Sequence, residues 1–281
     1  DAVTAIRMAT LNAAECFDLK DRGAIAPGYR ADVVLLDDLK DFHVNRVFIQ
    51  GALVAEEGKY LPEIKRYDIS TVKGSVIVKD FSAEKFKMHL KSNKVNVIKI
   101  LPGGVVTAKD TAEIQLDENG EFVRNPEEDI VKVAVVERHQ GTGNVACGFL
   151  KGYGIKAGAV ALSIAHDSHN IIVVGVSDEE MEFAVNSLIA QEGGMVLVKE
   201  GKVLESMPMP IAGLMSDQSG EWVDEKLTAI HAKAYEELGI AGDVEPVMTL
   251  CFMSLAVIPE IKLTDMGLFD VTTFSFIPVE V

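Results

Sequence analysis

Two imidazoles, a carboxylate, a hydroxyl and an amide occur together in one short stretch, His166-Asp167-Ser168-His169-Asn170. Side chains of these types can bind a metal ion, move a proton or form hydrogen bonds to a heterocyclic ring. Apolar, β-branched runs at residues 160–164 and 171–175 flank the stretch, and each is typical of a buried strand. The polar residues are therefore predicted to form a turn between two strands, where binding groups are often placed.

The alternative interpretation of this turn is purely structural. Asp, Ser and Asn favour turns because their short side chains bond to the nearby backbone, and the two histidines would then only cap strand ends. His139 follows another predicted strand, residues 131–136, and would join the turn if the two strand ends lie at the same edge of the sheet. Beside it, Arg138 could take part in an anion site with His139, but a surface ion pair of Glu137 and Arg138 is the interpretation we favour.

The segments that must position these residues are mostly short strands. A short strand is predicted after the Pro27-Gly28 turn, strand-turn-strand units at residues 46–60 and 195–204, and strands at residues 95–100, 131–136 and 274–281. Helices are predicted at residues 2–19, at residues 83–90, from the Ser177 cap to Gly193, and at residues 222–238. Because the strands come in hairpin-sized runs with few helices between them, the pattern predicts an α+β fold with a mixed or antiparallel sheet. A domain boundary is expected near residues 70–95.

Composition limits the classes of function. With 281 residues, of which 48% are hydrophobic, the chain is predicted to fold as one large or two ordinary domains. Its net charge of −16 and lack of a Lys/Arg cluster argue against nucleic acid binding, and its longest apolar run is too short for a bilayer. Three isolated cysteines, Cys16, Cys147 and Cys251, favour a reducing cytoplasm and are expected to fill cores.

Two groups of residues resemble known families. The stretch Ala9-Thr10-Leu11-Asn12-Ala13-Ala14, followed by Gly23-x-Ile25-x-Pro27-Gly28-x-x-Ala31-Asp32, resembles the closing segment of the amidohydrolase superfamily. The second half resembles the C-terminal domain of bacterial adenine deaminases through Glu137-Arg138-His139, Thr142-Gly143-Asn144, Gly152-x-Gly154, Gly158-Ala159, residues 165–170, Pro208-x-Pro210-Ile211-Ala212-Gly213-Leu214-Met215-Ser216-Asp217 and Pro259-Glu260-x-Lys262-x-Thr264-Asp265-x-Gly267-Leu268.

The resemblance implies three parts of the chain. Residues 1–65 would be the last barrel helix and the β-sandwich return of an amidohydrolase, residues 66–94 a connector, and residues 95–281 a C-terminal domain of α/β sandwich-like architecture. The catalytic (β/α)8 barrel would be mostly absent from this chain, which begins at Asp1 in what reads as the middle of a domain. We therefore expect a fragment whose first helix keeps apolar side chains exposed, among them Ile6, Met8, Leu11 and Phe17.

The resemblance also implies a function. Adenine deaminases of this type are expected to be cytoplasmic hydrolases of purine catabolism that use a Mn or Fe pair to convert adenine and water to hypoxanthine and ammonia. No His-x-His occurs in this chain, so the catalytic residues cannot be assigned, and we expect no metal to bind the chain alone. The expected partners are adenine, the missing barrel and further copies in a homo-oligomer.

For the six polar residues the resemblance suggests a substrate-side or lid role, and these are His139, His166, Asp167, Ser168, His169 and Asn170. The alternative for the whole chain is an accessory or oligomerisation module without activity of its own.

Overall fold

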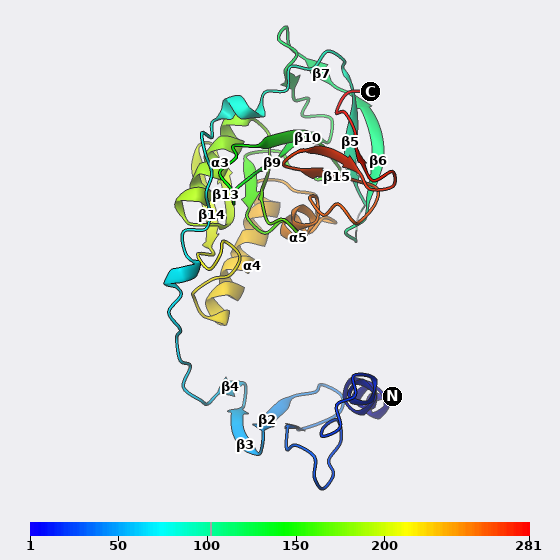
Figure 1. Cartoon of the computed structure of the whole chain (residues 1–281), viewed down its shortest axis with the longest axis vertical. Coiled ribbons are helices and arrows are strands. Elements are labelled where there is room, and N and C mark those ends of the chain that lie inside the picture. Colours follow the sequence, from blue (N-terminus) through cyan, green and yellow to red (C-terminus); the bar gives the residue numbers. More distant parts are fainter. Residues whose placement is uncertain (102) are drawn as a thin grey trace. The chain divides into compact units, whose positions relative to one another are not determined.

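The structure is a computed structural model that describes residues 1–101 and 103–281. It divides the chain into two compact units, Asp1–Asp68 and Ile69–Val281, which are described separately here (Figure 1). No helix within the described residues is long and apolar enough to cross a membrane.

The first unit is a helical segment followed by a small antiparallel sheet. The helical segment consists of α1 (Ala2–Arg7), a π-helical stretch (Met8–Asn12) and α2 (Ala13–Cys16), as the helical spacing of its apolar residues predicts. Asp1 caps it, because its carboxylate accepts a hydrogen bond from the Thr4 backbone N–H at 2.8 Å. The sheet has the order β1-β2-β3-β4 and the strands β1 (Val33–Leu36), β2 (Val44–Ile49), β3 (Ala52–Glu56) and β4 (Lys59–Tyr60).

This unit has little core of its own. Ala14 is the one buried residue among residues 1–68, all of which the structure describes. Met8 and Phe17 are 63% and 76% exposed, so the expected exposed apolar surface on the first helix is confirmed for these two, whereas Ile6 and Leu11 are half-buried. The helix and β1 line an apolar groove of about 590 Å³. Cys16 is exposed here, so the expectation that all three cysteines fill cores is wrong.

A mixed eight-stranded sheet forms the centre of the second unit. Its order is β14-β13-β11-β12-β9-β10-β5-β6, and every neighbouring pair is antiparallel except β10 with β5. The strands are β5 (Lys94–Ile100), β6 (Thr107–Glu113), β9 (Ile130–Val136), β10 (Val145–Lys151), β11 (Ala159–Leu162), β12 (Ile171–Gly175), β13 (Gly194–Lys199) and β14 (Lys202–Pro208). The α+β class with a mixed sheet is thereby confirmed, and the described residues contain no closed barrel.

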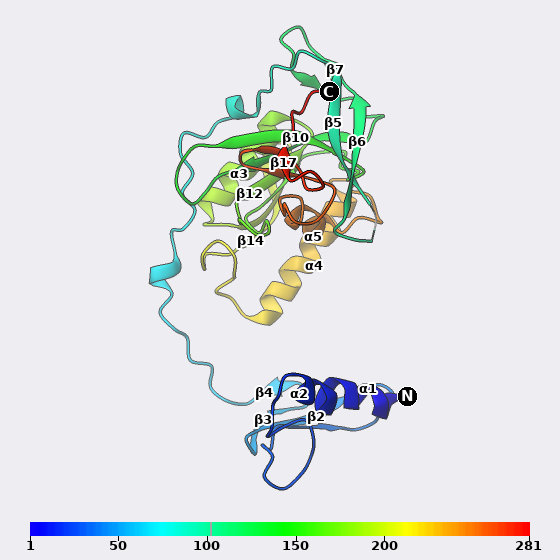
Figure 2. The ribbon, with the colours of Figure 1, turned by 45° about the vertical axis from the view of Figure 1, so that its right-hand side comes forward.

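Both faces of this sheet are covered (Figures 1 and 2). Successive side chains of a strand point to opposite faces, so Val133 and Val135 pack on one side and Ala134 and Val136 on the other. The helix α3 (Asp178–Ala190) covers the second side, and Ser177 caps it as predicted, since its hydroxyl accepts from the Glu180 backbone N–H.

The first side of the sheet is covered by several shorter elements. These are α4 (Gly220–Glu236), α5 (Pro246–Cys251) and the hairpin of β15 (Ile261–Thr264) and β16 (Gly267–Asp270). The strand β17 (Ser275–Phe276) extends that hairpin and is shorter than the predicted terminal strand, and β7 (Gln115–Leu116) pairs with β8 (Phe122–Val123) beside the main sheet.

The segment that leads into the main sheet holds only two turns of 3-10 helix, at Ser70–Val72 and Ala83–Phe86. The predicted helix over residues 83–90 is wrong beyond Phe86, because the next backbone donors bond elsewhere. The N–H groups of Met88 and His89 donate to the Glu121 carboxylate, and that of Leu90 donates to the Gly120 carbonyl. Tertiary partners thus replace the intrahelical bonds.

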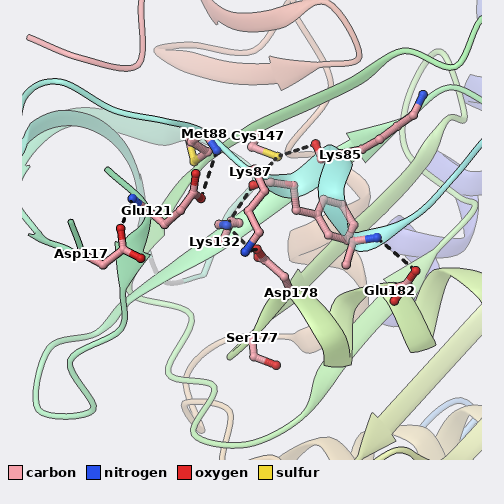
Figure 3. A network of polar contacts seen from close by, with 12 residues as sticks. Lys85, Lys87, Met88, Asp117, Glu121, Lys132, Cys147, Ser177, Asp178 and Glu182 are labelled. Carbon is pink, nitrogen blue, oxygen red and sulfur yellow. Dashed lines mark hydrogen bonds and ion pairs between the residues drawn. The ribbon is translucent and has the colours of Figure 1, made fainter. Parts of the chain in front are cut away.

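Hydrogen bonds and ion pairs of charged side chains hold the segment around Phe86 against the sheet (Figure 3). The ammonium of Lys132, on the central strand β9, donates to the Phe86 carbonyl at 2.9 Å and to the Asp178 carboxylate at 2.7 Å. Lys87 lies 3.4 Å from the other oxygen of Asp178. Because each of these charges has a partner, the group explains how the segment is held and leaves no charge free for a ligand.

Candidate functional site

The polar stretch predicted as a turn joins β11 to β12, and we call residues 166–170 the histidine loop. The two strands pair antiparallel, with Leu162 opposite Ile172, so the loop lies at one edge of the covered sheet. The backbone of the loop is itself bonded: the His166 N–H donates to the Cys251 carbonyl at 2.8 Å, and the His169 N–H to the Ala165 carbonyl at 2.6 Å. The turn prediction is therefore confirmed, and the loop is a fixed element.

The five side chains of the loop differ in exposure. Asp167 and Ser168 are exposed, His166 and His169 are half-buried, and Asn170 is buried. The Asn170 side-chain oxygen accepts from the Arg138 backbone N–H at 3.3 Å, so this amide serves the fold. Asp167 forms no hydrogen bond with either imidazole among the contacts of the described residues. Four side chains of the loop therefore remain available to a ligand.

Aromatic packing sets the orientation of the two imidazoles. The His166 ring lies with its centroid 4.8 Å from that of Phe252, which directly follows α5. The His169 ring meets the His166 ring edge to face at 5.2 Å. The end of α5 therefore holds the loop through both a ring contact and a backbone hydrogen bond.

His139 joins the histidine loop through the order of the strands. β12 pairs antiparallel with β9, and Val136 lies opposite Ile171, so the end of β9 is beside the start of β12. The His139 Nε2 lies 2.7 Å from the Ser168 carbonyl oxygen. Because a carbonyl only accepts, Nε2 carries the proton. The end of β9 and the start of β12 lie at the same edge of the sheet, which is the condition under which His139 is expected to join the histidine loop.

The neighbours of His139 are not the surface ion pair that the sequence favoured. Glu137 is 6% exposed and Arg138 is 1% exposed. The Glu137 carboxylate accepts hydrogen bonds from the N–H groups of His139, Gln140 and Thr142 at 2.5, 2.7 and 2.9 Å, and from the Thr142 hydroxyl at 3.0 Å. Glu137 therefore builds the turn that carries His139.

These donors keep Glu137 ionised. Burial acts to raise the pKa of its carboxyl, but the N–H groups of Gln140, Thr142 and His139 outweigh it and lower the pKa from 4.5 to about 2. Because the folded pKa lies below the unfolded value, the carboxylate stabilises the fold above pH 4.5, and this contribution is lost as the pH falls toward 2.

We expect Glu137→Gln to lower the free energy of unfolding at pH 7 by about 1.5 kcal/mol, since a neutral amide accepts more weakly and its NH2 group faces donors. The difference from the parent chain should shrink as the pH falls from 4.5 to 2 in urea titrations. Glu118→Gln, at an exposed position, is the control. A difference that stays constant with pH would contradict this explanation.

The surroundings of His169 lower the pKa of its imidazole. Burial is the largest cause, the electrostatic interactions with His166 and Arg138 lower the pKa further, and Asp167 acts to raise it. The Nδ1 of His169 is buried and has no hydrogen-bond partner within the described part of the chain. Burying an imidazole N–H without an acceptor costs more free energy than burying the unprotonated nitrogen, so we assign the proton to Nε2. His169 thus offers an N–H donor to a ligand.

The described residues contain no group of three or more His, Cys, Asp or Glu side chains arranged to hold a metal ion. The two imidazoles of the histidine loop meet edge to face, and the Nδ1 of His169 is enclosed. The side chains of the histidine loop therefore do not fit the dinuclear metal centre that the resemblance implies for the complete enzyme.

A profile described as the adenine deaminase C-terminal domain matches residues 104–275, and the amidohydrolase family matches residues 1–54. The chain therefore belongs to the adenine deaminase C-terminal domain family. It is 66% identical over 280 residues to adenine deaminase 2 of Desulfotalea psychrophila, with all of this chain and 49% of the relative covered. It is 50% identical over 278 residues to an adenine deaminase of Ligilactobacillus salivarius, with 99% of this chain and 48% of the relative covered. The chain spans about half the length of these curated relatives.

Sequence reasoning found the polar residues of this site, missed two of the groups that hold them, and assigned Arg138 to a surface ion pair. Phe252 and the Cys251 carbonyl come from a segment more than eighty positions away, and no local pattern connects them to the loop. Arg138 adjoins His139 within a block of residues that resembles the family, but no local pattern shows that it is buried.

Proposed function

We propose that this chain is the C-terminal part of an adenine deaminase that hydrolyses adenine to hypoxanthine and ammonia. The observation that carries the proposal is the 66% identity over the whole chain with a protein named adenine deaminase 2. The metal pair, Mn or Fe, would be bound by parts of the enzyme that this chain does not contain, and it would supply the hydroxide that attacks the ring. The three cysteines without disulfides suit an enzyme of purine catabolism in the cytoplasm.

The histidine loop would act on the substrate side of this reaction. Adenine has acceptors at its ring nitrogens and donors at its exocyclic amine. An N–H of His169 matches the first, and the exposed oxygens of Asp167 and Ser168 match the second. A loop that lies over the bound purine would also keep water from the reacting centre, apart from the water that is consumed.

The apolar groove of the first unit supports the proposal that a further part of the enzyme packs there. Ile25 is 90% exposed and Phe17 is 76% exposed beside it, and both line the groove. Exposed apolar surface of this kind marks a site of protein contact. In the complete enzyme the catalytic barrel would pack into this groove, and the first helix of this chain would be the last helix of that barrel.

The test is the substitution of His166 and His169 by alanine in the complete enzyme. We expect kcat/KM for adenine to fall by about 10- to 100-fold for each, the effect of losing one hydrogen bond to a buried polar group. The metal content should stay unchanged, since the loop is not assigned as a ligand set. His89→Ala is the control, because that imidazole is exposed and contacts Glu121, away from the loop.

Two outcomes would contradict the proposed role. Unchanged kcat and KM with an unchanged melting temperature would leave the histidines without a part in the reaction. Loss of bound metal would show that they act as ligands and not on the substrate side.

A further inference from the structure

Arg138 is the largest of the fully buried side chains, and its backbone and guanidinium bind three separate segments. The Nε donates to the His169 carbonyl at 2.5 Å, one terminal nitrogen to the Ala212 carbonyl at 3.2 Å, and the other to the Ser75 carbonyl at 3.5 Å. Its backbone N–H donates to Asn170, and its carbonyl accepts from the Ile77 N–H at 2.8 Å. The histidine loop and the segment around Ser75 are each bonded to it twice.

This arrangement is costly, and packing alone does not explain it. A buried cation is normally paired with a carboxylate, but Arg138 has no ion pair among the described residues, and burial lowers its pKa. Carbonyl oxygens accept the hydrogen bonds of the guanidinium, and the nearby charge of Glu137 acts to raise its pKa without outweighing the burial. A planar fork of five donors can reach three carbonyls from one position, and the single ammonium of a lysine cannot.

The loop around Ala212 is shaped to accept the guanidinium. A Cβ on Gly213 would lie 2.7 Å from a terminal nitrogen of Arg138 and would displace the guanidinium, and the φ of +71° favours glycine. The Gly213 carbonyl in turn accepts from the Ser163 hydroxyl at 2.5 Å, next to the end of β11. Ser163, which lies between β11 and the histidine loop, and His169, within the loop, are therefore both connected to residues 212–213, Ser163 directly and His169 through Arg138.

We propose that Arg138 is the positioning residue of the histidine loop: it fixes His166 and His169 by holding the His169 carbonyl, and it couples the loop to the segment around Ser75. His169 has a φ of +53°, a conformation that its side chain alone disfavours and that the bond from Arg138 holds. The importance of this for turnover rests on the proposed function of the loop.

The experiment is Arg138→Lys in the complete enzyme, read by hydrogen exchange and by kinetics. We expect faster exchange in residues 166–172, 75–78 and 211–215 together, and a fall of about 10²-fold in kcat/KM for adenine, mostly in kcat, as for a displaced catalytic group. Arg124→Lys is the matched control, since Arg124 also donates to a carbonyl, that of Ile155, without contact to the loop.

Exchange in residues 166–172 that does not change in Arg138→Lys would overturn the proposal, whatever the activity. Faster exchange with unchanged turnover of adenine would leave Arg138 as the positioning residue and overturn the proposed function of the loop instead. If Arg138→Lys does not fold, Gly213→Ala displaces the guanidinium without removing it, and the same loss of protection in the three segments is expected.

Discussion

Replacement of Gly158 by alanine is expected to lower the free energy of unfolding by at least about 4 kcal/mol, which is a large part of the stability of a typical domain. Gly158 precedes β11, and its Cβ would lie 1.9 Å from the Val198 carbonyl oxygen and 2.9 Å from the Leu238 side chain. The Val198 carbonyl belongs to the backbone of β13, which pairs with β11. The added Cβ can therefore avoid this clash only if the two strands separate. The φ of +67° adds strain of about 1 kcal/mol.

Gly201 provides a matched control for this substitution. It has the same φ of +67°, but a Cβ there meets nothing within 4 Å. Gly201→Ala is therefore expected to lower the free energy of unfolding by about 1 kcal/mol, from backbone strain alone. Urea unfolding of both variants measures the two values. Equal losses at the two positions would show that strain, and not the clash with β13, sets the cost.

Replacement of Lys262 by methionine is expected to stabilise the chain by up to about 3 kcal/mol at pH 7. Lys262 is completely buried on β15, and its ammonium donates to the Val105 carbonyl at 3.1 Å. Lys262 forms no ion pair with a carboxylate of the described residues, and Asp270, on the neighbouring strand β16, is paired with Lys109 at 2.9 Å. Burial lowers the pKa of Lys262 from 10.5 to about 8.

The sign of this effect follows from the two pKa values. Below pH 8 the folded chain carries a buried ammonium whose charge the unfolded chain keeps in water, so the penalty is complete there. Between pH 8 and 10.5 the unfolded chain binds more protons than the folded one, so stability rises with pH and the penalty fades. In Lys262→Met this rise should be absent.

Measurement of the free energy of unfolding between pH 7 and 10.5 tests this prediction, with Lys99→Met at an exposed position of β5 as the control. A destabilised Lys262→Met at pH 7 would show that the bond to Val105 outweighs the cost of the buried charge.

Much of the fold could be predicted from local patterns. The apolar runs on both sides of the histidine loop are β11 and β12, and the Ser177 cap begins α3 where the sequence places it. These features follow from the chain's neighbours in sequence, since alternation and capping involve residues only a few positions apart. The helix predicted after Phe86 is wrong for the same reason: Glu121, more than thirty positions away, takes its backbone donors.

The candidate site was predictable in its residue types but not in its construction. The sequence by itself determined that two imidazoles, Asp167 and Ser168 share one turn between strands. Only the tertiary structure decided that His139 reaches the Ser168 carbonyl, because that contact depends on β12 lying next to β9. It also decided that Arg138 is buried, because the carbonyls of Ser75 and Ala212, 63 and 74 positions away, surround it. A charged residue in a sequence is predicted to be solvated, since the partners that make its burial possible are supplied by distant segments.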